Sequence, residues 1–181
     1  SPRFMLVLLS YAVVTLVYSL LLKRIAMLDV VTLAALYTIR IIAGAVAIPV
    51  EASFWLLAFS MFLFLSLAMT KRYTEIRRVA AGSDTKVAGR GYGVDDLPLI
   101  QSLGTSSGYL SVLVLAFYIN STASTALYRH HEVLWVLAPI RLYWISRVWL
   151  LARRDEMHDD PVVFALTDRV TVFRNGQRVL T

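Results

Sequence analysis

Long apolar stretches alternate with short basic segments along the chain. Five of the stretches reach about 17 residues or more, the length that lets an α-helix cross about 30 Å of hydrocarbon. They cover residues 4–22, 30–50, 54–70, 97–119 and 133–152. The pattern predicts an all-α fold, namely a polytopic transmembrane bundle of about five helices.

Basic residues concentrate in alternate connections between these stretches. Lys23 and Arg24 separate the first two stretches, and Arg153 and Arg154 follow the fifth. The connection after the third stretch holds the largest group, Lys71, Arg72, Arg77, Arg78, Lys86 and Arg90. The other two connections contain one basic residue, Arg129. The positive-inside rule therefore predicts that the three basic segments face the cytoplasm, and we expect the bacterial inner membrane as the location.

Composition supports a membrane protein. Of the 181 residues, 58% are hydrophobic and 17% are charged, and the mean hydropathy is +0.66. This chain is too apolar for an ordinary soluble domain. Its net charge of +6 is accounted for by the basic loops, so no nucleic-acid partner is expected. Cysteine is absent, which excludes disulfides, thiolate metal sites and a cysteine nucleophile. The sequence leaves the oligomeric state open.

We divide the chain into a bundle, residues 1–168, and a polar tail, residues 169–181. No run of about 18 apolar residues occurs beyond residue 154, so no sixth span is expected. The chain starts without Met and shows no cleavage pattern, which is typical of a fragment of a longer protein. Asp159 and Asp160 could bind a hard cation, although a solvated acidic turn before Pro161 is the more common arrangement.

The strongest cluster of candidate functional residues lies at the basic end of the third stretch. It comprises Lys71, Arg72, Tyr73 and Glu75. Within about one helical turn, it offers cations for phosphate oxygens, a phenol, and a carboxylate that could take Mg²⁺. The same residues also fit a basic belt at the membrane surface in which Lys71 pairs with Glu75. The pattern alone leaves both interpretations open.

Charged residues inside or beside the other stretches give weaker signals. Lys23 and Arg24 follow Tyr18 at the end of the first stretch, and by charge alone they are topology signals. Arg40 lies inside the second stretch, where a charge in hydrocarbon is costly, so we expect it to have a partner or to face a polar cavity. The same argument applies to Arg141 and, with less force, to Arg147, which lies nearer a helix end.

Small residues and proline predict local packing. Gly44 and the pair Gly104 and Gly108 suit close contacts between helices, since glycine lets two backbones approach. Pro139 lies within the fifth stretch and predicts a kink there.

Three segments together resemble the UbiA superfamily of intramembrane prenyltransferases. They are YSLLLKR from Tyr18, LDVVTLAALYTIRIIAGA from Leu28 and KRYTE from Lys71. The resemblance implies a fold of nine helices, of which this chain would supply the fourth to the eighth. KRYTE resembles the branch of decaprenyl-phosphate phosphoribosyltransferases, which implies a phosphoribosyl diphosphate donor and a polyprenyl phosphate acceptor.

The resemblance also implies a site that holds diphosphate and Mg²⁺. KRYTE would replace the second acidic motif, commonly DxxxD, with Lys71 at its first Asp and Glu75 at its second. Glu75 would help to hold Mg²⁺, while Lys71, Arg72 and Lys23 would neutralise the leaving diphosphate. The residues assigned to substrate binding are Lys23, Arg24, Tyr18 and Arg40. The first acidic motif is not in this sequence and the last helix is not found after Asp168, so we expect this chain by itself to be inactive.

Other functions remain open at this stage. A prenyltransferase that moves a polyprenyl group from its diphosphate to an aromatic or other acceptor would need the same site. Intramembrane arginines and a kinked helix would also suit an anion transporter. A membrane partner without catalytic activity is a further alternative.

Overall fold

The computed structural model describes residues 2–48, 53–82, 90–121, 124 and 131–155. Asp159, Asp160 and the predicted polar tail, 169–181, lie outside the described residues. The described chain forms five α-helices, α1 (Pro2–Leu20), α2 (Leu28–Ala47), α3 (Phe54–Ala81), α4 (Leu97–Ile119) and α6 (Leu137–Arg154). Three short 3-10 helices lie between them, η1 (Leu22–Arg24), η2 (Val94–Asp96) and η3 (His131–Val136).

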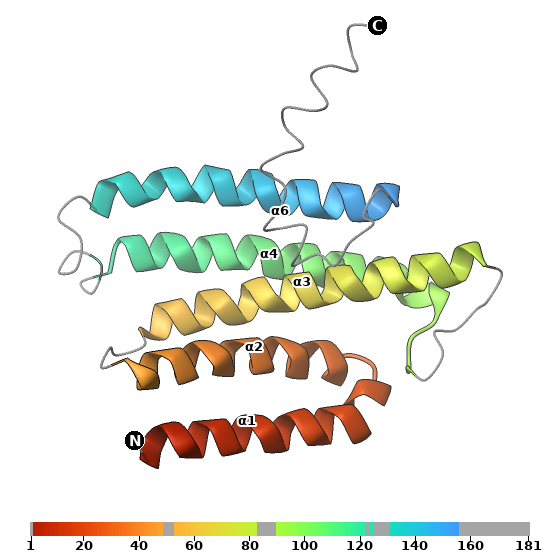
Figure 1. Ribbon diagram of the computed structural model, residues 1–181. Helices are drawn as coiled ribbons and strands as arrows, with labels where there is room; N and C mark the ends of the chain where they lie inside the picture. Colours follow the sequence, from red (N-terminus) through yellow and green to blue (C-terminus); the bar gives the residue numbers. More distant parts are fainter. Residues whose placement is uncertain (1, 49–52, 83–89, 122–123, 125–130, 156–181) are drawn as a thin grey trace, which may run out of the picture.

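Successive helices run in opposite directions and lie side by side in chain order (Figure 1). Helix α3 is central, because it packs against α2 on one side and α4 on the other, and α6 closes the bundle against α4 and α3. The predicted all-α bundle is therefore confirmed.

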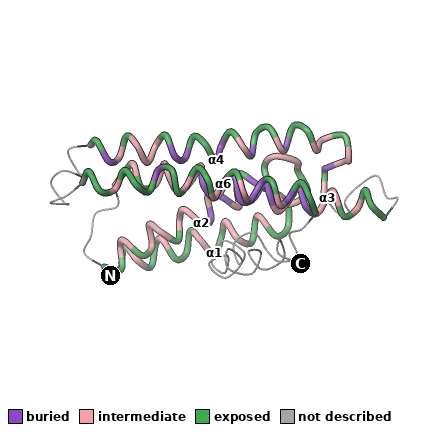
Figure 2. Tube along the Cα trace, turned by 90° about the horizontal axis from the view of Figure 1, so that it is seen from above, coloured by how far each residue is buried: buried purple, intermediate pink, exposed green. Residues whose placement is uncertain are grey.

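Four segments are long and apolar enough to cross a membrane: Leu28–Ala47, Phe54–Ala81, Val94–Ile119 and Glu132–Arg154. The first predicted span is also an apolar helix, but its stretch Phe4–Leu20 is shorter. Large apolar side chains point outward along α1, and Met5, Leu6 and Leu9 are each more than 60% exposed. Exposed and partly buried positions predominate along α1 and α2, whereas buried ones gather on α3, α4 and α6 (Figure 2). An apolar outer surface of this kind suits a lipid environment.

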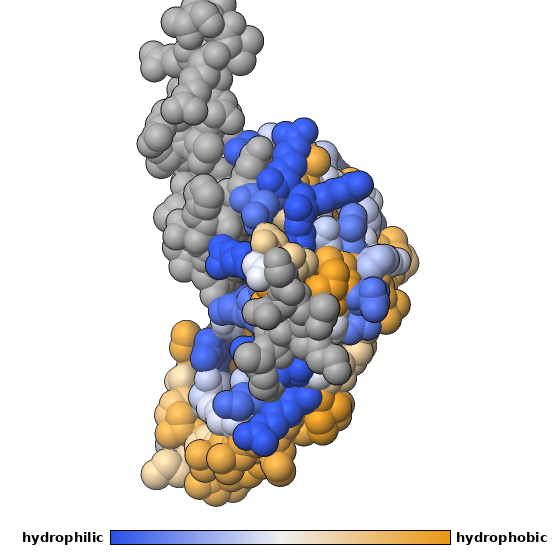
Figure 3. Space-filling model, turned by 90° about the vertical axis from the view of Figure 1, so that its right-hand side faces the viewer, coloured by the Kyte–Doolittle hydropathy of each residue, from blue (hydrophilic) through white to orange (hydrophobic). Residues whose placement is uncertain are grey.

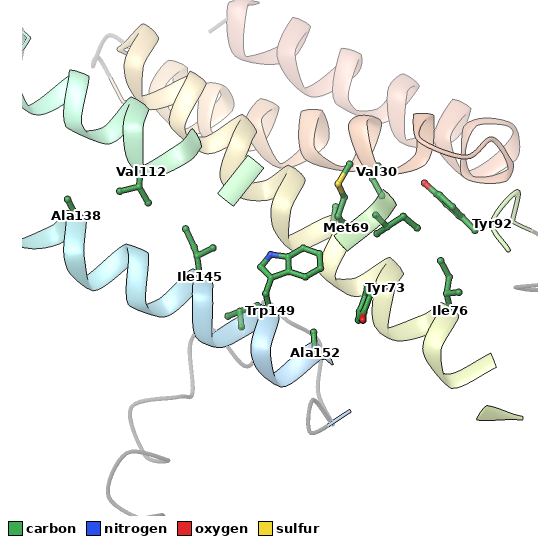
Figure 4. Close-up of a cluster of buried hydrophobic side chains, with 13 residues drawn as sticks. Val30, Met69, Tyr73, Ile76, Tyr92, Val112, Ala138, Ile145, Trp149 and Ala152 are labelled. Atoms are coloured by element: carbon green, nitrogen blue, oxygen red, sulfur yellow. The ribbon is translucent and has the colours of Figure 1, made fainter. Parts of the chain in front are cut away.

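The tightest packing occurs where α4 meets α3 and α6. A Cβ at Gly104 would lie 2.2 Å from the Trp149 ring, and one at Gly108 would lie 2.6 Å from Ile145, so both positions require glycine. Trp149 and Ile145 project from α6 toward α3 and α4 within the buried cluster (Figure 4). The predicted contact at this glycine pair is confirmed. The contact predicted at Gly44 is wrong, since nothing lies within 4 Å of a Cβ placed there.

Two helix boundaries differ from the predictions. Helix α3 continues to Ala81, beyond the apolar stretch, so its 28 residues extend about 42 Å. Its last turns therefore reach past the end of the bundle (Figure 1). Pro139 lies in the first turn of α6, after the 3-10 helix η3, and not in a helix interior. Proline fits there because the first turn leaves backbone N–H groups without helical partners, so the kink predicted within the helix is replaced by a change of helix type.

Candidate functional site

Four parts of the chain, three of them rich in basic residues, gather at one end of the bundle, which we call the basic end. The α1–α2 connection, the last turns of α3, residues 90–96 and the end of α6 all lie there (right-hand side of Figure 1). Viewed onto this end, hydrophilic side chains cover much of the described surface, and hydrophobic ones lie below them and at their sides (Figure 3). The structure thus brings Lys23 and Arg24 to the same end as Lys71, as the charge pattern predicts.

A buried carboxylate organises this end. Asp29 lies in the first turn of α2 and is 0% exposed. Its Oδ2 is 2.6 Å from Nη2 of Arg72 and 3.5 Å from Nη1 of Arg90, and its Oδ1 accepts a hydrogen bond of 2.5 Å from the Tyr92 hydroxyl. A charge removed from water in this way needs such partners. We call Asp29, Arg72, Glu75, Arg90 and Tyr92 the Asp29 cluster.

Arg72 is held between two carboxylates. It is 1% exposed, and besides Asp29 it forms an ion pair through Nη1 with Oε2 of Glu75, one turn further along α3. Its buried Nε has no hydrogen-bond partner among the described residues. Arg90 also approaches Oε2 of Glu75, with its Nε 3.8 Å away. Arg72 therefore lies inside the bundle between two carboxylates, so it is not part of a basic belt at the membrane surface.

Tyr92 anchors residues 90–93 to the start of α2. Its hydroxyl accepts a 2.7 Å hydrogen bond from the backbone N–H of Met27 and donates to Asp29. Its ring lies 5.8 Å from the Arg72 guanidinium carbon. Burial, with the hydrogen bond to Asp29 as a second cause, raises the pKa of Tyr92 well above its usual value. The phenol therefore stays protonated and remains a donor to Asp29.

Gly91 fits tightly against the α1–α2 connection. A Cβ there would lie 3.0 Å from the carbonyl oxygen of Arg24 and 3.1 Å from the backbone nitrogen of Ala26. Glycine thus permits the close approach of two segments that are remote in sequence. Gly91 and Tyr92 are thus both used in contacts within the chain.

The other predicted residues are distributed as follows. Lys71 is partly exposed, and Tyr73 is 5% exposed and faces the core, with its ring 5.8 Å from that of Trp149. Lys23 is partly exposed and Arg24 is exposed. Tyr18 lies near the end of α1 and makes no polar contact with the Asp29 cluster within the described part of the chain.

Arg40 lies apart from this cluster, about 16 Å further along α2 than Asp29. It donates hydrogen bonds to the Tyr11 hydroxyl from Nε at 3.1 Å and from Nη2 at 2.6 Å, and it lies over the rings of Tyr11 and Tyr37. The prediction that Arg40 needs a partner is confirmed, and Tyr11 on α1 is that partner. Arg141 similarly lies over the rings of Phe59 and Trp144.

No group of three potential metal ligands occurs among the described residues. Glu75 is 28% exposed in its side chain, and both guanidinium contacts are made to Oε2. Oε1 is thus the carboxylate oxygen available to a cation. Mg²⁺ in proteins is commonly held by one or two carboxylates together with substrate phosphates, so Glu75 fits the part of a single protein ligand.

Sequence reasoning did not assign three members of the cluster, Asp29, Arg90 and Tyr92, to a site, although it counted Arg90 among the basic residues. The available signal was weak: an acidic residue directly before an apolar run, and an arginine and a tyrosine in a glycine-rich connection. Nothing in the spacing of these residues links them, because their pairing depends on how α2 and α3 are packed.

The chain is similar to two rhizobial proteins. It is 38% identical over 173 residues to an uncharacterized protein, y4nM, of Sinorhizobium fredii. This alignment covers 94% of this chain and 33% of that protein. It is 34% identical over 170 residues to the nodulation protein NoeC of Azorhizobium caulinodans. This alignment covers 93% of this chain and 55% of that protein. The chain therefore spans about a third and just over half of these relatives. No protein-family profile matches it, and no solved structure is significantly similar.

Proposed function

We propose that this chain acts in an integral membrane transferase of the UbiA type, which moves phosphoribose from phosphoribosyl diphosphate to a polyprenyl phosphate. The observation that supports it is the basic end, to which the fold brings Lys23, Arg24 and Lys71 together with the partly exposed carboxylate of Glu75. A nine-helix fold, and a site on the cytoplasmic face of a bacterial inner membrane, are parts of the same proposal.

The proposed reaction exchanges one oxygen for another at the anomeric carbon of ribose. The bond from C1 to the diphosphate oxygen breaks, and diphosphate leaves with the electron pair. A phosphate oxygen of the lipid forms the new bond to C1. Because the leaving group carries several negative charges, cations placed around it lower the barrier to its departure.

The residues of the basic end would have separate roles in this reaction. Lys23, Arg24 and Lys71 would bind phosphate oxygens of the donor, and Glu75 would present Oε1 to Mg²⁺. When bound, Mg²⁺ would supply charge neutralisation at the diphosphate. The lipid acceptor would need no extraction from the bilayer, because hydrophobic side chains border the hydrophilic ones at the basic end (Figure 3).

The names of the two relatives do not state any chemical reaction. One relative is uncharacterized, and the other is named for nodulation. Support therefore comes from the site and from the resemblance of its segments to the UbiA superfamily.

The test is an assay of membranes that contain the full-length protein, with labelled phosphoribosyl diphosphate, polyprenyl phosphate and Mg²⁺. We expect a labelled lipid product, and we expect Lys71→Ala and Glu75→Ala to lose it while the protein still inserts into the membrane. Arg154→Ala is the matched control, since it removes an exposed cation from the same end on α6 and should keep activity. Full activity in both test variants would refute the assignment.

Two other outcomes would replace the proposal. A product formed from polyprenyl diphosphate and an aromatic acceptor, with none from phosphoribosyl diphosphate, would identify a prenyltransferase. Ion flux across vesicles without any lipid product would identify a transporter.

A further inference from the structure

We infer that Asp29 is a positioning residue of the donor site: it fixes Arg72 and Glu75, and it holds residues 90–93 against the α1–α2 connection. The inference rests on the proposed function, because it takes a diphosphate donor as the ligand for which this end is arranged. Neither Asp29 nor Arg72 would touch the donor, since they are 0% and 1% exposed.

The charges of the Asp29 cluster balance one another. The carboxylates of Asp29 and Glu75 face the guanidinium groups of Arg72 and Arg90. A balanced and largely buried set of charges attracts no anion from solution. Attraction of the donor must come from cations outside the cluster, and Lys23, Arg24 and Lys71 are exposed or partly exposed candidates at the same end.

Asp29 acts on Glu75 through Arg72. The same guanidinium contacts Oδ2 of Asp29 through Nη2 and Oε2 of Glu75 through Nη1. Because a guanidinium is planar and rigid, fixing one of its nitrogens also fixes the direction of the other. The Glu75 carboxylate is thereby turned so that Oε1 faces away from both arginines.

Asp29 also holds residues 90–93 in place. It accepts the hydroxyl proton of Tyr92 in a hydrogen bond, and Tyr92 in turn binds the backbone N–H of Met27. Met27 has a φ of 66°, a conformation that residues other than glycine keep only where their surroundings enforce it. Residues 90–93 thus contact the connection that carries Lys23 and Arg24. Through these contacts, Asp29 links the position of those two cations to the position of Glu75.

Cross-linking tests this arrangement without any assay of activity. A Cβ at Gly91 would lie 3.6 Å from the Cβ of Ala26, within the range of about 3.5–4.5 Å that a disulfide requires. The 181 residues contain no cysteine, so an Ala26→Cys/Gly91→Cys pair adds the only two thiols within them, and the parent full-length protein gives the background of any other thiol. We expect the oxidised pair to lose both free thiols in the full-length protein, and Asp29→Asn to reduce that loss. The two single-cysteine variants are the controls.

Trypsin provides a second readout that leaves Gly91 unchanged. Arg90 is 27% exposed in its side chain and is paired with Asp29 and Glu75, so cleavage after Arg90 should be slow. Asp29→Asn should accelerate it, and the milder variant Tyr92→Phe should do so to a smaller degree. If cross-linking and cleavage are the same with and without Asp29→Asn, the inference is overturned.

Kinetics separate positioning from folding. We expect Asp29→Asn to raise the KM for phosphoribosyl diphosphate about ten- to hundredfold, as is typical when a residue that supports a ligand-binding group is changed. The KM for the lipid acceptor should stay constant. The double variant Asp29→Asn/Arg72→Gln should raise the KM for phosphoribosyl diphosphate no more than either single variant does, because both residues act on Glu75 as a unit. A fall in kcat alone, with both KM values constant, would show a merely structural role and contradict the inference.

The two sets of measurements fail independently. Absence of any product from the parent protein would refute the proposed function, whereas cross-linking and proteolysis would still decide whether Asp29 holds residues 90–93. Product formation with cross-linking that does not depend on Asp29 would keep the proposed function and remove the positioning role.

Discussion

Asp29 and Arg72 form a buried ion pair, with Oδ2 2.6 Å from Nη2, that joins the first turn of α2 to α3. Both side chains are almost fully removed from solvent. Loss of one partner would leave an uncompensated charge in the interior, which costs about 3–5 kcal/mol. This pair therefore connects the stability of the bundle to the arrangement of its basic end.

Membrane topology can be tested with single cysteines, because the chain has none of its own. Arg24→Cys and Asp95→Cys place exposed thiols at the basic end, and Asn120→Cys places one after α4, at the opposite end. We expect an impermeant maleimide to label the first two from one face of the membrane and the third from the other face. Labelling of positions 24 and 95 from opposite faces would rule out a shared site.

Glycine substitutions should separate two positions that look alike in the sequence. Gly104→Ala forces a Cβ against the Trp149 ring and against Met69, so we expect a loss of about 1–3 kcal/mol in the free energy of unfolding. Gly44→Ala is the matched control in another helix, because its Cβ meets open space. Alanine favours a helix over glycine, so this variant should be neutral or up to about 1 kcal/mol more stable. Thermal unfolding in detergent, followed by tryptophan fluorescence, measures both, and equal effects would contradict the packing of α4 on α6.

The Tyr92 phenol predicts a stability loss at high pH. Its pKa is raised on folding, so the folded chain holds this proton more tightly than the unfolded chain does. The resulting stabilisation is complete below about pH 10, the pKa of an unfolded tyrosine, and decreases as the pH rises above it, by about 1.4 kcal/mol per pH unit. We expect Tyr92→Phe to be less stable than the parent at pH 8.

The parent and Tyr92→Phe should differ less in free energy of unfolding above pH 10, because only the parent loses the stabilisation that comes from the Tyr92 proton. Tyr109→Phe removes an exposed tyrosine on α4 that does not contact Asp29, and it serves as the control. Unfolding curves recorded from pH 8 to 11 give the comparison. A difference that stays constant across this range would show that the Tyr92 proton is not linked to folding.

The helices could be predicted from the sequence because apolar runs in a membrane protein have few alternatives to the α-helix. The predicted stretch 97–119 coincides with α4. The stretch 54–70 marks the apolar part of α3 but not its end, since the following KRYTEIRR segment is compatible with a helix without being apolar.

The orientation of individual side chains could not be predicted in the same way. Lys71 and Arg72 are adjacent, yet one is partly exposed and the other is buried, because successive residues on a helix point about 100° apart. The rotation of α3 against α2 decides which of them meets Asp29. The rotation of α3 depends on its packing against its neighbours, for example where Gly104 and Gly108 of α4 meet Met69 and Ser66 of α3, and such contacts carry no information about charge.

Helix α3 runs without interruption from the apolar interior to its polar last turns. A single residue added or removed near position 70 would turn every later side chain by about 100° and carry Arg72 away from Asp29. Substitutions on the outer face of this segment are tolerable by comparison, since they leave the register unchanged. The number of residues between the buried half of α3 and Arg72 thus determines whether the ionic contacts at the end of this helix can form.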